Sequence, residues 1–136
     1  MTDLNKETVI GVIGAGTMGR GIAQVAATSG HIVKIYEVSE EVRKSATGEL
    51  RRILNRLAEK GKLTPEEADG IYHRIHLIEN MVELADCSLI FEAVVEETKI
   101  KRLLFKELET IVNPDTILAT NTSSLSITGI ASACSD

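Results

Sequence analysis

The chain has 136 residues, of which 43% are hydrophobic and 26% charged, and its formal net charge is −5. This length and balance fit one globular domain with a single core. The negative charge disfavours a nucleic-acid partner or an anionic membrane surface, and no apolar run is long enough to span a membrane. Cys87 and Cys134 have no metal-binding or redox spacing, so we predict no metal site and a reducing, cytoplasmic location.

The first half of the chain alternates apolar runs with helical patterns. Residues 8–13 form an apolar run typical of a buried strand, and residues 17–29 follow with helical spacing. A second strand is predicted at 32–36 and a long amphipathic helix at 39–60. The capping box at 64–67 begins another helix, so these two helices should project as a hairpin.

The second half continues the alternation. Strands are predicted at 75–78, 88–93 and 116–120, with a helix at 97–112. Because strands alternate with helices, they should pair in parallel through right-handed crossovers. We therefore predict an α/β fold, a doubly wound Rossmann sheet of order 3-2-1-4-5 with the helical hairpin inserted between the second and third strands.

A glycine-rich segment directly follows the first strand and opens the first helix. It reads G-x-G-x-x-G, in which the first glycine permits a tight turn, the second lets the backbone approach a pyrophosphate, and the third lets the helix pack closely on the strand. The alternative is that the glycines serve only a tight turn. In this context we predict a dinucleotide-binding loop made of Gly14, Ala15, Gly16, Thr17, Met18 and Gly19.

Glu37 ends the second strand, where an acidic residue accepts hydrogen bonds from the adenine ribose and repels a 2′-phosphate. Neither Val38 nor Ser39, which follow it, supplies a cation to neutralise such a phosphate. The sequence therefore predicts NAD rather than NADP as the cofactor. The alternative is a solvated glutamate at a strand end.

Three motifs together resemble one family. Residues 14–24 (GAGTMGRGIAQ), 91–96 (FEAVVE) and 119–128 (ATNTSSLSIT) are similar to the 3-hydroxyacyl-CoA dehydrogenases, most of all to the bacterial 3-hydroxybutyryl-CoA enzymes. The resemblance spans nearly the whole chain. It implies an oxidoreductase of fatty acid metabolism that interconverts 3-hydroxyacyl-CoA and 3-oxoacyl-CoA, with NAD as hydride acceptor and a short acyl chain.

The resemblance also implies roles for residues that follow the last two strands. Ser123 would hydrogen-bond the nicotinamide and the substrate oxygen, unless it only caps the next helix. Lys101 would lie beside the cofactor, although an ion pair with Glu97 is the alternative. The cofactor-binding residues implied in this part are Ala93, Val94, Glu96, Lys101, Asn121 and Ser123.

The family's helical hairpin helps to hold CoA, so Lys60 and Lys62 are candidates for contact with a CoA phosphate. The alternative is a solvated helix face on which Glu49 and Glu59 balance the cations.

None of the three histidines is placed to act as general base, because His31, His73 and His76 should lie at the amino-terminal edge of the sheet. The resemblance implies that the catalytic histidine, its orienting glutamate and a helical substrate and dimerisation domain lie beyond residue 136. We therefore predict that residues 1–136 form an incomplete Rossmann domain, truncated before its last strands, that binds NAD without turnover. The parent enzyme should be a homo-oligomer, and the exposed edge of the last strand should let the fragment self-associate.

Two other functions stay open. The chain could be the nucleotide domain of another beta-hydroxyacid dehydrogenase, or a NAD-binding module that is not catalytic. The Asn-Thr-Ser-Ser segment at 121–124 and the length of the hairpin favour the 3-hydroxyacyl-CoA enzymes over the first of these.

Overall fold

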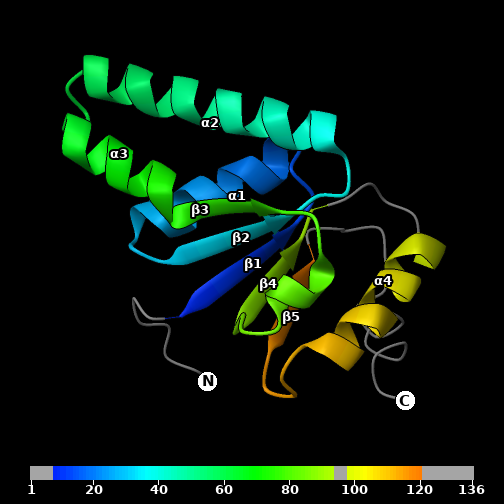
Figure 1. Cartoon of the computed structure of the whole chain (residues 1–136). Helices are drawn as coiled ribbons and strands as arrows, with labels where there is room; N and C mark the ends of the chain where they lie inside the picture. The colour runs from blue at the N-terminus through cyan, green and yellow to red at the C-terminus, as the bar shows by residue number, and fades with distance from the viewer. Residues whose placement is uncertain (1–7, 94–97, 121–136) are drawn as a thin grey trace.

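A five-stranded parallel sheet forms the centre of the computed structural model, which describes residues 8–93 and 98–120 (Figure 1). The strands are β1 (Val9–Ile13), β2 (Ile32–Tyr36), β3 (Ile75–Ile78), β4 (Leu89–Glu92) and β5 (Ile117–Thr120). Their order is β3-β2-β1-β4-β5, and every neighbouring pair is parallel. The predicted fold class and strand order are confirmed. The order reverses between β1 and β4, which is where ligands bind in such sheets.

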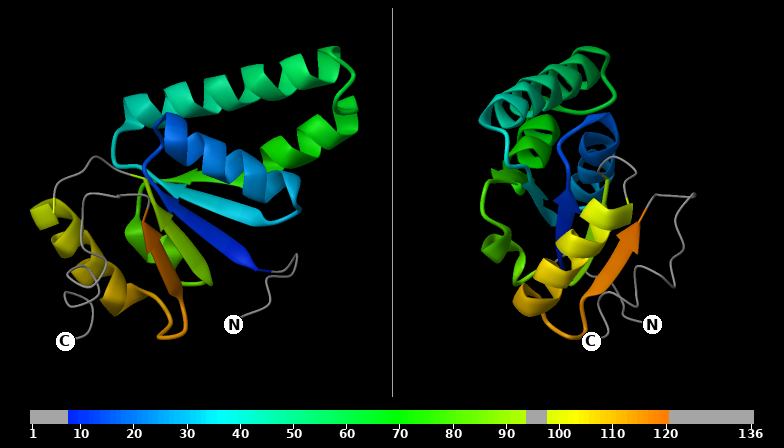
Figure 2. Two further views of the ribbon diagram at one scale, coloured as in Figure 1. Left: turned by 180° about the vertical axis from the view of Figure 1, so that it is seen from behind. Right: turned by 90° about the vertical axis from the view of Figure 1, so that its right-hand side faces the viewer.

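Helices cover both faces of the sheet (Figures 1 and 2). They are α1 (Thr17–Thr28), α2 (Glu40–Glu59), α3 (Pro65–Arg74), the 3-10 helix η1 (Met81–Leu84) and α4 (Thr98–Ile111). One apolar cluster joins α1, α2 and α3 to one face, and a second joins η1 and α4 to the other. Burial on both faces explains why β1 reads as a continuous apolar run.

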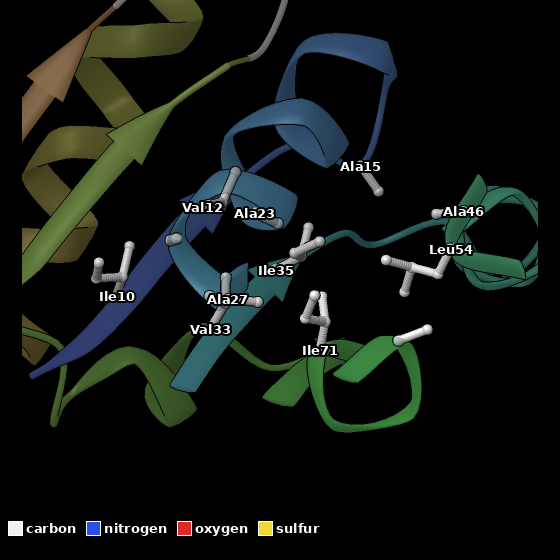
Figure 3. Packing of buried hydrophobic residues seen from close by; sticks show 12 residues of the cluster. Ile10, Val12, Ala15, Ala23, Ala27, Val33, Ile35, Ala46, Leu54 and Ile71 are labelled. Carbon is white, nitrogen blue, oxygen red and sulfur yellow. The ribbon is translucent and has the colours of Figure 1, made fainter. Parts of the chain in front are cut away.

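Small residues let α1 pack closely on the sheet. Its buried positions are Gly19, Ala23, Ala26 and Ala27. Figure 3 shows Ala23 and Ala27 against the side chains of β1 and β2, among them Val12 and Ile35. The short side chains bring the first turn of α1 close to the carboxyl end of β1, where the glycine-rich turn lies.

Each helix of the α2–α3 hairpin has a side-chain cap at its N-terminus. Ser39 accepts the N–H of Val42 at 3.2 Å, and Thr64 and Glu67 form the predicted capping box. The buried side chains of Leu54 and Ile71 join the core cluster, so the inner face of the hairpin belongs to the core. Its tip lies exposed at the far end of α2 (Figure 1).

The 3-10 helix η1, which was not predicted from the sequence, follows β3 and buries Met81 and Leu84. Asn80 caps it by accepting the N–H of Val82 at 3.0 Å. A four-residue helix is too short to show a hydrophobic period, so pattern reading cannot find it. None of the helices in the described part of the chain is long and apolar enough to cross a membrane.

Candidate functional site

The turn after β1 is tied to the neighbouring strand. Gly14 has a φ of 104°, in the left-handed region that favours glycine. Its N–H donates to the carbonyl of Tyr36, the last residue of β2, at 2.9 Å. The turn is therefore fixed between the carboxyl ends of β1 and β2.

The two later glycines of the turn differ in what surrounds them. A Cβ on Gly19 would lie 1.9 Å from the carbonyl oxygen of Gly14, so only glycine lets the helix approach the turn this closely. A Cβ on Gly16 would meet no atom within 4 Å. Packing therefore explains Gly19 and leaves Gly16 bordering open space in front of the helix.

The first turn of α1 opens toward this space. Gly16 is the N-cap residue, no side chain among the described residues caps the helix, and its first turn holds no acidic residue. Thr17 and Met18 are exposed. The first N–H groups of a helix lack partners within the helix, and its dipole favours an anion there. The residues present therefore fit the pyrophosphate of a dinucleotide.

Glu37 links the glycine turn to the start of α2. One carboxylate oxygen accepts the N–H of Ala15, and the other accepts the N–H of Ser39, each at 3.2 Å. The Glu37 N–H donates to the carbonyl of Ile78 at the end of β3, at 3.0 Å. The carboxylate thus lies beside the turn, within reach of a ribose attached to a pyrophosphate at α1.

A cation that was not predicted from the sequence lies beside this glutamate. Arg43 comes one helical turn after Ser39 and donates from Nη1 to the Glu37 carbonyl at 2.6 Å. Its Nη2 pairs with the carboxylate of Glu79 at 3.2 Å. A basic residue four positions into the helix that follows the acidic strand end is the signal that could have found it.

The end of β4 contributes a second part of the edge. The N–H of Ala93 donates to the carbonyl of Ile13 at 2.9 Å, which holds this end against β1. Glu92 is buried here although its side chain is polar, and it too was not singled out from the sequence. Of the residues predicted on the nicotinamide side, Lys101 falls within α4, but its side chain lies outside the described residues, as do Val94, Glu96, Asn121 and Ser123.

The two lysines predicted to contact CoA lie apart from this edge. Lys60 and Lys62 are exposed in the turn after α2, which Gly61 closes with a φ of 73°. Because α2 is 20 residues long, the tip is about 30 Å from its start beside Glu37. Figures 1 and 2 show the tip at the end of the hairpin away from the converging strand ends.

The histidines lie near the amino-terminal ends of the strands, away from the glycine turn at the carboxyl ends. His31 precedes β2 and is buried, with Nδ1 3.1 Å from the Thr8 carbonyl. His73 lies in the last turn of α3, its Nδ1 2.8 Å from the carbonyl of Asp69, and His76 is the second residue of β3. None lies at the carboxyl edge, where the turn and Glu37 meet.

A family model described as "3-hydroxyacyl-CoA dehydrogenase, NAD binding domain" matches residues 9–136. A probable 3-hydroxybutyryl-CoA dehydrogenase of Deinococcus radiodurans is 48% identical over 123 residues, which is 90% of this chain and 44% of the relative. A 3-hydroxyadipyl-CoA dehydrogenase of Escherichia coli is 42% identical over 128 residues, which is 94% of this chain and 27% of the relative. The chain thus spans less than half the length of these curated relatives.

A solved structure shares this fold. The crystal structure of a 3-hydroxybutyryl-CoA dehydrogenase from Escherichia coli superposes with a TM-score of 0.89 at 43% identity, covering 94% of this chain and 27% of that one. The described carboxyl edge, with its glycine turn and Glu37, is therefore set in a fold shared with solved dehydrogenases.

Proposed function

Because the chain belongs to the family of 3-hydroxyacyl-CoA dehydrogenase NAD-binding domains, we propose that it binds NAD at the carboxyl edge of its sheet for an enzyme that interconverts 3-hydroxyacyl-CoA and 3-oxoacyl-CoA. Residues 1–136 are proposed to act as one Rossmann domain within that enzyme. The names of the relatives favour a short acyl chain such as 3-hydroxybutyryl. NAD, when bound, supplies the hydride acceptor.

One observation carries the proposal: the Glu37 carboxylate lies against the glycine turn, 3.2 Å from the N–H of Ala15. The turn and the start of α1 would hold the pyrophosphate, and Glu37 would exchange its backbone donors for ribose hydroxyls. A 2′-phosphate would place its charge beside that carboxylate, so NAD is favoured over NADP.

Roles nearer to the reacting atoms are proposed from the resemblance. Ser123 would donate to the substrate oxygen, where negative charge develops, and Glu96, Lys101 and Asn121 would line the nicotinamide side. Because all three histidines lie away from the carboxyl edge, residues 1–136 alone are proposed to bind NAD without turnover; a missing general base costs about 10²–10⁴-fold in rate.

Two further proposals concern the whole enzyme. Lys60 and Lys62, exposed at the hairpin tip, would meet a CoA phosphate, and alanine at both positions should weaken CoA binding by the complete enzyme. The complete enzyme is also proposed to be a homo-oligomer. A cytoplasmic location stays a prediction.

The test is a titration of the 136-residue chain into NADH and then NADPH, following cofactor fluorescence. The chain has no tryptophan, so protein fluorescence contributes little background. Saturable enhancement with NADH and a much weaker response to NADPH is the expected result. Equal responses would overturn the role of Glu37, and no response to either would overturn NAD binding by this chain.

A further inference from the structure

Arg43 is bonded to the backbone of Glu37 on the adenosine side of the proposed NAD site. Its guanidinium joins two strand ends, through Nη1 to the Glu37 carbonyl after β2 at 2.6 Å and through Nη2 to Glu79 after β3 at 3.2 Å. Only 16% of its side chain is exposed, against 74% for Glu79. The guanidinium therefore lies inward, against the backbone of the site.

The location of Arg43 on α2 explains this reach. Its own N–H donates to the carbonyl of Ser39 at 2.9 Å, which places it in the first full turn of the helix. Side chains on a helix tilt toward its N-terminus, so a long arginine there extends back to the strand end. A guanidinium presents several donors in a planar fork, so it can bind two acceptors at once, whereas an ammonium acts as a point charge.

The Glu37 peptide is consequently held on both sides. Its N–H donates to Ile78 at 3.0 Å, and its carbonyl accepts from Arg43. With both main-chain groups bonded, the backbone of Glu37 is held and the direction of its Cα–Cβ bond is set. Here that direction brings the carboxylate to the N–H groups of Ala15 and Ser39.

We infer that Arg43 is a positioning residue for the adenosine-ribose subsite, since it holds the Glu37 peptide so that the carboxylate faces the glycine turn. The inference rests on the proposed function. Arg43 acts through Glu37 and does not itself touch the cofactor. It differs from the exposed ion pairs of α2, such as that of Lys44 with Glu40, whose side chains are 79% and 73% exposed and hold no backbone group of the site.

The experiment compares Kd for NADH and thermal unfolding of the 136-residue chain and its variants. Arg43→Gln removes the charge and the fork, and Lys44→Gln is the matched control one residue away. Arg43→Gln should raise the Kd for NADH about tenfold, the size expected if one hydrogen bond from the ribose to the Glu37 carboxylate is lost. Lys44→Gln should leave it unchanged. Arg43→Lys keeps the charge but not the fork, so its Kd should lie between those of wild type and Arg43→Gln.

A double-mutant cycle separates positioning from general stabilisation. If Arg43 acts through the Glu37 carboxylate, Arg43→Gln should add little to the Kd of Glu37→Gln, whereas independent effects would multiply. Multiplied effects, or an unchanged Kd in Arg43→Gln, overturn the inference. Absence of NADH binding by the wild type overturns the proposed function instead. If Arg43→Gln fails to fold, Arg43→Lys replaces it in the same cycle.

Discussion

A Cβ placed on Gly19 would lie 1.9 Å from the carbonyl oxygen of Gly14, so the start of α1 and the turn before it can approach this closely only with glycine at position 19. The segment from Gly14 to Gly19 is also the one proposed to face the pyrophosphate. The packing of the fold and the shape of the proposed site therefore depend on the same two residues.

Gly19→Ala should destabilise the chain by about 3 kcal/mol or more, because the new methyl group meets backbone that cannot move aside. The gain in helix propensity from alanine, about 1 kcal/mol, is too small to offset this clash. Urea unfolding followed by circular dichroism measures the loss. A stability equal to that of wild type would show that α1 can shift away from the turn.

Gly16→Ala is expected to affect binding instead of folding. A Cβ at position 16 meets no atom within 4 Å, so the free energy of unfolding should change by less than about 1 kcal/mol. NADH affinity should fall at least tenfold, because the methyl group would occupy the space proposed for the pyrophosphate. The same urea titration and the NADH titration test both halves, and unchanged NADH affinity would mean that the pyrophosphate lies elsewhere.

Glu37→Gln should weaken discrimination between NADH and NADPH. The amide keeps one oxygen as acceptor but removes the charge that repels a 2′-phosphate, so the ratio of the Kd for NADPH to that for NADH should fall about tenfold. Glu41→Gln, an exposed residue of the first turn of α2, loses the same charge away from the glycine turn and should keep the ratio. Equal changes in the two variants would attribute the effect to net charge alone.

The parts of this site that could be predicted are those encoded by local sequence. The strand order follows from short apolar runs that alternate with helices, and the turn follows from the spacing of Gly14, Gly16 and Gly19 after β1. The contact of Arg43 with Glu37 has a local signal, a basic residue in the first turn of the helix after the acidic strand end, whereas its contact with Glu79 joins side chains 36 residues apart and no local pattern specifies it. The burial of His31, whose Nδ1 lies 3.1 Å from the Thr8 carbonyl, is likewise not encoded by a local pattern.

Phe105→Ala should destabilise the chain by about 3–5 kcal/mol, because the Phe105 side chain is 1% exposed in the cluster beneath α4 and its loss leaves a cavity. Leu103→Ala, on the same helix but 62% exposed, should cost less than about 1 kcal/mol. Chemical denaturation of the two variants gives the comparison. Similar losses would mean that α4 does not pack on the sheet as described.

Cys87 should be unreactive in the folded chain. It is buried, and burial raises the pKa of its thiol from 9.0 to about 12, with Asp86 contributing in the same direction. In a Cys134→Ser background at pH 8, iodoacetamide should label Cys87 at least about a thousandfold more slowly in the folded chain than in urea, because the thiolate is the nucleophile. Rapid labelling without urea would show that this part of the core opens readily.

The same shift sets the sign of the alkaline dependence. The folded state favours the protonated thiol, so the stabilisation is fully present below pH 9 and is lost as the pH rises from 9 toward 12. Cys87→Ala, compared in the Cys134→Ser background, should lack this part of the alkaline decline in the free energy of unfolding. Identical declines in both proteins would mean that Cys87 does not contribute.

Self-association of the 136-residue chain is expected through β5. Among the described strands, β5 pairs only with β4, so one of its backbone edges has no strand beside it, and Ile117 is 44% exposed. An edge of this kind favours pairing with a second chain, and a lysine on it disfavours that pairing. Sedimentation velocity should therefore show concentration-dependent association that Ile117→Lys reduces.

The control is Ile32→Lys, which removes an isoleucine that is 38% exposed at the start of the interior strand β2 and should leave association unchanged. A wild-type chain that stays monomeric at high concentration would contradict association through this edge, whereas equal effects of the two lysines would assign it to exposed apolar surface in general.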